Sequence, residues 1–174
     1  MVTRDPLSSS TRRLVQALRV ICLLALGLFA LLAGALLVSP ELVTRGGWPL
    51  DALPAGPLRW AALAIGVLLL APPAWAAAEL TRLSTAFLSG EVYAPAPARH
   101  LSRAGKALLL TAASGVAARP ALDLLVGLSQ GGGSVSVTIG SGDLVLLGCG
   151  LLLQALGRVL ADAARLAAEN RAFV

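Results

Sequence analysis

The chain has 174 residues, of which 57% are hydrophobic and only 13% are charged, and its mean hydropathy is +0.82. A soluble domain carries about 25% charged residues, so this composition indicates an integral membrane protein and leaves no room for a separate soluble domain. The net charge of +5 does not indicate direct nucleic-acid binding, because the basic residues flank apolar segments instead of gathering on one water-exposed face.

Two uninterrupted apolar segments define the first half of the chain. Residues 20–38 and 60–78 are each 19 residues long and carry no charge. A bilayer core about 30 Å thick is crossed by about 20 helical residues, so both segments are predicted to span a membrane. The first segment is longer than the apolar region of a signal peptide, usually about 7 to 15 residues, and no small-residue cleavage site follows it, so we expect an uncleaved anchor.

Two further spans are predicted in the second half. Residues 107–128 are apolar except for Arg119 and Asp123, and residues 144–161 are apolar except for Gln154 and Arg158. The predicted fold is therefore an all-α membrane protein with four transmembrane helices, which form a single domain over residues 1–174.

The distribution of basic residues predicts the orientation of these spans. Basic residues cluster before the first span, between the second and third, and after the fourth, whereas the opposite side carries only Arg45 and Arg59. Loops rich in Lys and Arg stay cytoplasmic. We therefore expect a multi-pass protein of a bacterial inner membrane with both termini in the cytoplasm.

The segment between the second and third spans is predicted to form a helix, a turn and a second helix. Apolar residues recur at helical spacing beyond residue 78 until Ser89 and Gly90, which are expected to end the helix, and Pro97 is well placed to open the next. His100 has no Cys or second His for a metal site, so we interpret it as a solvated residue at the membrane surface.

Arg119 and Asp123 are the most unusual residues of the third span. They are four residues apart and share a helix face, so we predict an intramembrane ion pair, with a broken helix near Pro120. A charge near the bilayer centre is costly, so such residues are functional candidates. A structural pair is the preferred interpretation, and an ion or ligand pathway is the alternative.

The loop after the third span and the fourth span itself carry two further patterns. Residues 134–139 alternate polar and apolar side chains, which predicts a short strand-like loop on the outer surface. In the fourth span, small and polar residues recur at helical spacing, which favours close helix packing within the bundle, or alternatively homo-oligomerisation. These residues are Gly150, Gln154, Gly157 and Ala161.

Several short motifs resemble one protein family. The motifs are Gly90-x-x-Tyr93 after the second helix, Leu101-x-x-x-Gly105 before the third, and Ala168-Glu169-Asn170-Arg171-Ala172-Phe173-Val174 at the end. They resemble the bacterial domain of unknown function 2975, although Ala168 replaces an acidic residue and Tyr93 a Phe. The resemblance implies a four-helix membrane fold and, in many relatives, a gene beside a small helix-turn-helix regulator.

No catalytic motif, metal site or cofactor site is found in the sequence, so we expect a protein that is not an enzyme. The leading hypothesis is a regulatory or scaffolding protein that acts through protein partners, with the helix-turn-helix regulator suggested by the resemblance alone. Its candidate cytoplasmic platform comprises Gly90, Tyr93, Gly105, Glu169 and Phe173. The alternative is a small transporter or channel subunit that uses Arg119 and Asp123.

Overall fold

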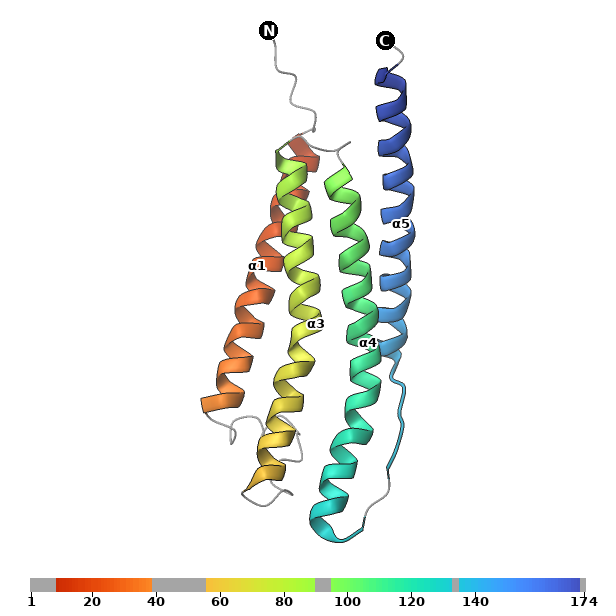
Figure 1. Ribbon diagram of the computed structural model, residues 1–174. Coiled ribbons are helices and arrows are strands. Elements are labelled where there is room, and N and C mark those ends of the chain that lie inside the picture. Colours follow the sequence, from red (N-terminus) through yellow and green to blue (C-terminus); the bar gives the residue numbers. More distant parts are fainter. Residues whose placement is uncertain (1–8, 39–55, 90–94, 133–134, 173–174) are drawn as a thin grey trace.

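The computed structural model describes residues 9–38, 56–89, 95–132 and 135–172, and these residues form four α-helices (Figure 1). The helices are α1 (Ser9–Val38), α3 (Pro57–Leu88), α4 (Pro95–Gln130) and α5 (Ser141–Ala172). Each is long and apolar enough to cross a membrane. The predicted four-helix fold is confirmed, and every helix extends beyond its predicted span.

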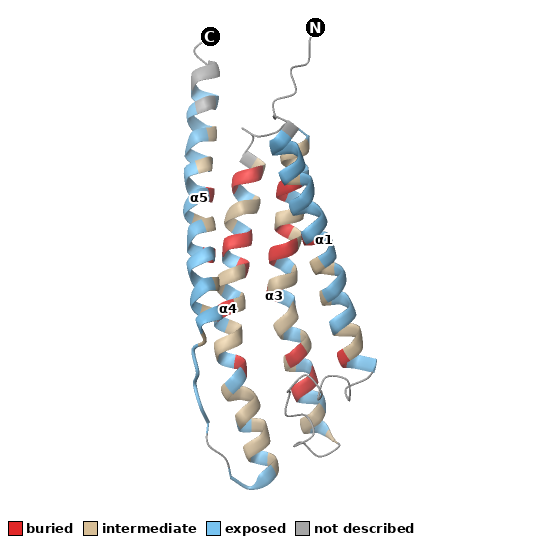
Figure 2. Cartoon of the chain, turned by 180° about the vertical axis from the view of Figure 1, so that it is seen from behind, coloured by how far each residue is buried: buried red, intermediate tan, exposed pale blue. Residues whose placement is uncertain are grey.

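The helices lie in a row that follows their order in the sequence, as the views from both sides show (Figures 1 and 2). α1 packs on α3, α3 packs on α4, and α4 packs on α5. The starts of α1 and α4 and the ends of α3 and α5 share one end of the row. We call this the basic end (Ser9, Pro95, Leu88 and Ala172), and the other the opposite end (Val38, Gln130 and Pro57). α5 begins beside the middle of α4 (Figure 1).

Small residues fill the contacts between helices, while many large apolar side chains face outwards. Leu36 of α1 packs with Ala62 and Leu63 of α3. The hydrophobic residues that α4 buries are all alanines, namely Ala98, Ala104, Ala107, Ala112 and Ala118. Close approach through small residues is typical of helices that pack in lipid, where hydrocarbon covers the exposed leucines and valines.

The helix break expected near Pro120 is not found, because α4 is continuous from Pro95 to Gln130. Proline removes one backbone hydrogen bond, whereas a break in an apolar environment would expose several backbone groups. α4 ends at Gln130. The next residue, Gly131, has a φ of 75° in the left-handed region, and the N–H of Gly132 donates to the carbonyl of Gly127 at 3.1 Å.

The predicted strand-like loop between α4 and α5 is also wrong. Residues 135–140 form an irregular loop in which Val135, Val137 and Ile139 are all exposed. An isolated strand is marginal without a partner, and the described part of the chain offers none. The backbone N–H of Ser136 donates instead to the side chain of Asp123, at 3.2 Å.

Candidate functional site at the basic end

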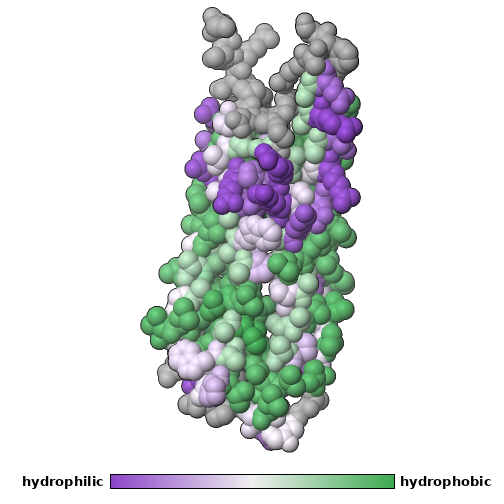
Figure 3. Space-filling view, viewed as in Figure 1, coloured by the Kyte–Doolittle hydropathy of each residue, from purple (hydrophilic) through white to green (hydrophobic). Residues whose placement is uncertain are grey.

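Hydrophilic residues gather at the basic end, above an apolar body (Figure 3). No charged residue occurs between Ala107 and Ala118 on α4 or between Leu144 and Gly157 on α5. Charges begin at Lys106 and Arg158, the next residues towards the basic end. Two polar arrangements lie there, a buried carboxylate between α3 and α4 and a cationic groove between α4 and α5.

The buried carboxylate belongs to Glu79 of α3, which is only 1% exposed. Its Oε1 accepts hydrogen bonds from Nε1 of Trp75 at 3.2 Å and from a guanidinium nitrogen of Arg82 at 3.0 Å. Its Oε2 lies 2.6 Å from Nδ1 of His100 on α4. Both oxygens therefore have partners, as a buried carboxylate requires.

This arrangement joins two helices, because Trp75, Glu79 and Arg82 share one face of α3 while His100 comes from α4. The interpretation of His100 as a solvated residue was wrong, since its side chain is 22% exposed and contacts the carboxylate. A signal was present in the spacing of Trp75, Glu79 and Arg82, which places a donor one turn before and one turn after an acid. Nothing in the sequence identified His100 as the partner.

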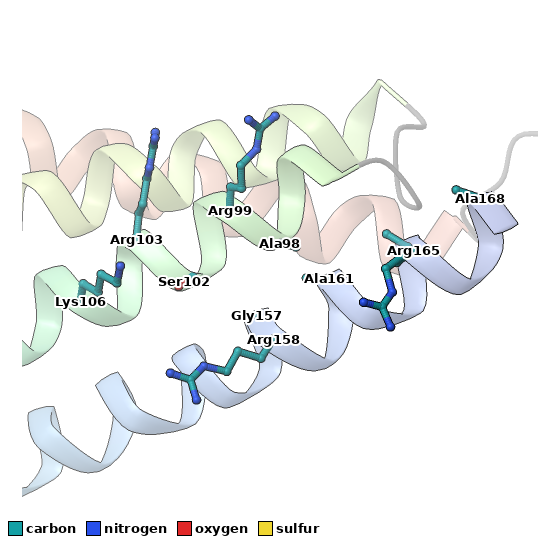
Figure 4. A pocket seen from close by; sticks show the side chains of 11 residues that line it. Ala98, Arg99, Ser102, Arg103, Lys106, Gly157, Arg158, Ala161, Arg165 and Ala168 are labelled. Atoms are coloured by element: carbon teal, nitrogen blue, oxygen red, sulfur yellow. The ribbon is translucent and has the colours of Figure 1, made fainter.

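A groove of about 580 Å³ runs between α4 and α5 at the basic end (Figure 4). Small residues occupy the space between the two helices, and long cationic side chains extend from both, those of Arg99 and Arg103 on the side of α4 away from α5 (Figure 4). Among the described residues that line the groove, five are cationic, namely Arg99, Arg103, Lys106, Arg158 and Arg165, and none is acidic. We call this feature the cationic groove.

Few carboxylates neutralise these cations. Within the described ranges, the only one of the five with a carboxylate within 4 Å is Arg165, whose Nε lies 3.6 Å from Oε1 of Glu169. Both side chains of that pair are largely exposed. Two other described acids lie in this region: Glu79 is already used by Arg82 and His100, and Asp162, on α5 between Arg158 and Arg165, has no basic group within 4 Å among the described residues. The cationic groove therefore has a strong excess of positive charge.

The small-residue stripe of α5 lies against α4. A Cβ on Gly105 would come within 2.7 Å of the carbonyl oxygen of Gly150 and 2.9 Å of the backbone nitrogen of Gln154. A Cβ on Gly157 would come within 3.0 Å of the backbone nitrogen of Ser102. Ala161, the last member of the stripe, lines the cationic groove.

The residues assigned to a cytoplasmic platform are only partly described. Gly105 is buried beneath α5 and so cannot belong to an exposed platform, because the small-residue contact occupies it. Glu169 lies near the end of α5 beside Arg165. Gly90, Tyr93 and Phe173 fall outside the described residues.

At the opposite end, the ion pair predicted between Arg119 and Asp123 is absent from the described residues. Asp123 accepts hydrogen bonds from the N–H and the hydroxyl of Ser136, at 3.2 and 3.1 Å. Arg119 is exposed. A Cβ on Gly140 would lie 3.9 Å from Nη2 of Arg119 and 3.3 Å from Oδ2 of Asp143, so Arg119 and Asp143 face the same glycine. The loop after α4 satisfies Asp123 in place of Arg119.

Comparison with known proteins identifies the family. Residues 52–174, well over half of the chain, match the family described as protein of unknown function (DUF2975). Neither the curated proteins nor the solved structures gave a match. The matched region contains α3, α4 and α5, the helices that form both polar arrangements of the basic end. The chain therefore belongs to the DUF2975 family, as the sequence motifs predicted.

Proposed function

We propose that this protein is a multi-pass membrane protein that catalyses no reaction and acts through a protein partner on the cytoplasmic side. Four helices long and apolar enough to cross a membrane support the insertion. The concentration of Arg and Lys at the basic end supports an orientation with that end in the cytoplasm. A regulatory or scaffolding role fits this arrangement.

The observation that carries the partner-based role is the projecting end of α5. Gly157 of α5 lies against Ala98 and Ser102, close to the start of α4 at Pro95. α5 continues to Ala172, well past that level, and projects beyond the other helices (Figure 1). The projecting end, residues 165–172, places a helix in water on the proposed cytoplasmic side.

The side chains of the projecting end suit a protein surface more than a lipid surface. Arg165 and Glu169 form an exposed ion pair along the helix. Leu166 is 56% exposed beside them. Protein interfaces combine an apolar centre with a polar rim, and Leu166 with its charged neighbours is compatible with a contact of that kind. The resemblance implies a helix-turn-helix regulator in many relatives. Such a regulator is cytoplasmic, so it could reach the projecting end of α5 on the proposed cytoplasmic side.

Site-specific photo-crosslinking in the native membrane tests the proposal. A photoreactive residue at Leu166 should give a discrete protein adduct whose second component is not this chain. The matched control is Leu152, an exposed leucine in the apolar part of the same helix, which should not give that adduct. If position 166 yields no protein adduct, or if both positions yield the same one, the cytoplasmic partner is rejected.

A small transporter or channel subunit is the alternative function. It would use Arg119 and Asp123 in a polar pathway. The alternative is less favoured, because Asp123 accepts hydrogen bonds from Ser136 and does not pair with Arg119, which is exposed.

A further inference from the structure

We propose that the cationic groove binds the headgroup of an anionic phospholipid, with a preference for a headgroup that carries two phosphodiesters. The proposal rests on the proposed membrane insertion and does not require the protein partner, although Arg165 belongs both to the cationic groove and to the projecting end of α5. It assigns a ligand to the surface between α4 and α5.

The position of the cationic groove along the helices matches the level of lipid phosphates. On α4 and on α5 the apolar part ends at Lys106 and Arg158, and both residues line the groove. Ser102 and Gly157 touch at the same height, since a Cβ on Gly157 would lie 3.0 Å from the nitrogen of Ser102. The groove therefore begins where the hydrocarbon should end and the headgroups begin.

The charge of the cationic groove suits phosphate. Four of its five cations are arginines, whose planar guanidinium groups bind phosphate oxygens through paired, charge-assisted hydrogen bonds. In the described part of the chain, Arg99, Arg103, Lys106 and Arg158 have no carboxylate within 4 Å. An anion that enters the groove does not need to displace an existing ion pair from these four residues.

The size and shape of the cationic groove leave room for more than one phosphate. Small residues such as Ala98, Ser102 and Ala161 line it, so its volume of about 580 Å³ is not filled by the chain's own side chains. Arg99 and Lys106 are seven residues apart, which is about 10 Å along a helix. Arg158 and Arg165 have the same spacing on α5. Cations spread over this length can contact two phosphates at once.

A general attraction of basic residues to a negatively charged leaflet would not need a groove. Arg13 and Arg19 of α1 lie at or near the same end and are exposed, but they do not line the cationic groove. Every basic residue near an anionic leaflet gains from its surface potential. The proposal requires that the groove residues contribute beyond this general effect.

Native mass spectrometry of the purified, delipidated full-length protein tests the proposal. The probes are phosphatidylcholine with no net charge, phosphatidylglycerol with one phosphodiester, and cardiolipin with two. Arg103→Gln/Arg158→Gln removes two charges from the cationic groove, and Arg13→Gln/Arg19→Gln is the matched control outside it. We expect binding in the order cardiolipin, phosphatidylglycerol, phosphatidylcholine. The groove variant should lose about tenfold or more in affinity per cation, because each substitution removes charge-assisted hydrogen bonds to phosphate, and the control should lose less than about twofold.

Several outcomes would overturn the proposal. Equal losses in the two double variants would mean general electrostatics, and equal binding of the three lipids would mean no anion site. Inorganic phosphate or pyrophosphate that displaces cardiolipin at similar concentrations would assign the groove to a soluble anion. Equal affinity for phosphatidylglycerol and cardiolipin would refute the preference for two phosphodiesters. If the groove variant fails to fold, Arg103→Lys/Arg158→Lys replaces it, with Arg13→Lys/Arg19→Lys as its control. This groove variant keeps its charge but loses the paired guanidinium bonds, so its affinity for cardiolipin should fall more than that of the control, and equal affinities would overturn the proposal.

Discussion

The imidazole of His100 and the carboxylate of Glu79 lie 2.6 Å apart, measured from Nδ1 to Oε2, although the two residues are 21 positions apart in the sequence. Glu79 is almost fully buried, so its charge is compensated by the protein and not by water. The contact ties α3 to α4 at the basic end. The cationic groove lies at the same end, between α4 and α5.

The contact between Glu79 and His100 should stabilise the packing of α3 on α4. Glu79→Gln and His100→Ala should each lower the free energy of unfolding by about 1–3 kcal/mol, because each leaves a buried polar group without its partner. In a double-mutant cycle, measured by unfolding in mixed micelles, the coupling between the two residues should exceed about 0.5 kcal/mol.

The surface pair Arg165 and Glu169 provides the matched control for this cycle. Its atoms are 3.6 Å apart and both side chains are mostly exposed, so its coupling should stay below about 0.5 kcal/mol. If the coupling of Glu79 with His100 is no larger than that of this pair, the buried tie contributes nothing beyond an ordinary surface ion pair.

The helical spans could be predicted because they follow from the sequence locally. A charge-free run of 19 residues such as residues 20–38 has few ways to satisfy its backbone in lipid other than a helix. The ends of the helices were harder to predict. Once a helix leaves the hydrocarbon, charged residues continue it without an apolar pattern, as at the end of α5.

The polar contacts could not be predicted, because they depend on which helices are neighbours. Glu79 and His100 are brought together by the packing of α3 on α4, and Asp123 and Ser136 by the path of a loop. The spacing of Arg119 and Asp123 predicted a local pair. In the structure, the carboxylate of Asp123 instead accepts hydrogen bonds from the N–H and the hydroxyl of Ser136 in the loop. Local spacing shows which residues can pair and does not show which partner is chosen.

The close approach of α4 and α5 predicts a strong effect of a single methyl group. Gly105→Ala should lower the free energy of unfolding by about 1–3 kcal/mol, because its Cβ would lie 2.7 Å from a backbone oxygen of Gly150 that cannot move alone. Gly148→Ala is the control, since a Cβ there meets nothing within 4 Å. It should be neutral, or stabilising by up to about 1 kcal/mol through helix propensity. Equal effects of the two substitutions would mean that α4 and α5 lie further apart at Gly105 than the 2.7 Å approach to Gly150 indicates.

The loop before α5 should depend on Asp123. Asp123→Ala removes the acceptor for the N–H and the hydroxyl of Ser136, so the exchange of that amide hydrogen should accelerate, by about fivefold for each 1 kcal/mol lost. Arg119→Ala should leave that exchange rate unchanged, because Arg119 does not bond Ser136. A larger response to Arg119→Ala than to Asp123→Ala would instead favour the ion pair predicted from the sequence.

The orientation of the row predicts the results of reporter fusions. Basic residues gather at the end where α3 stops and α4 starts, and segments rich in Arg and Lys remain in the cytoplasm. Fusions after Arg99 and after Val174 should therefore report a cytoplasmic location, and a fusion after Gly132, at the opposite end, an external one. The fusion after Val174 also tests the number of spans, because four crossings return the chain to the side on which α1 begins. An external result at Val174 with a cytoplasmic result at Arg99 would mean that α4 and α5 do not both cross the membrane, and the cationic groove between them would then lose its place at the lipid phosphates.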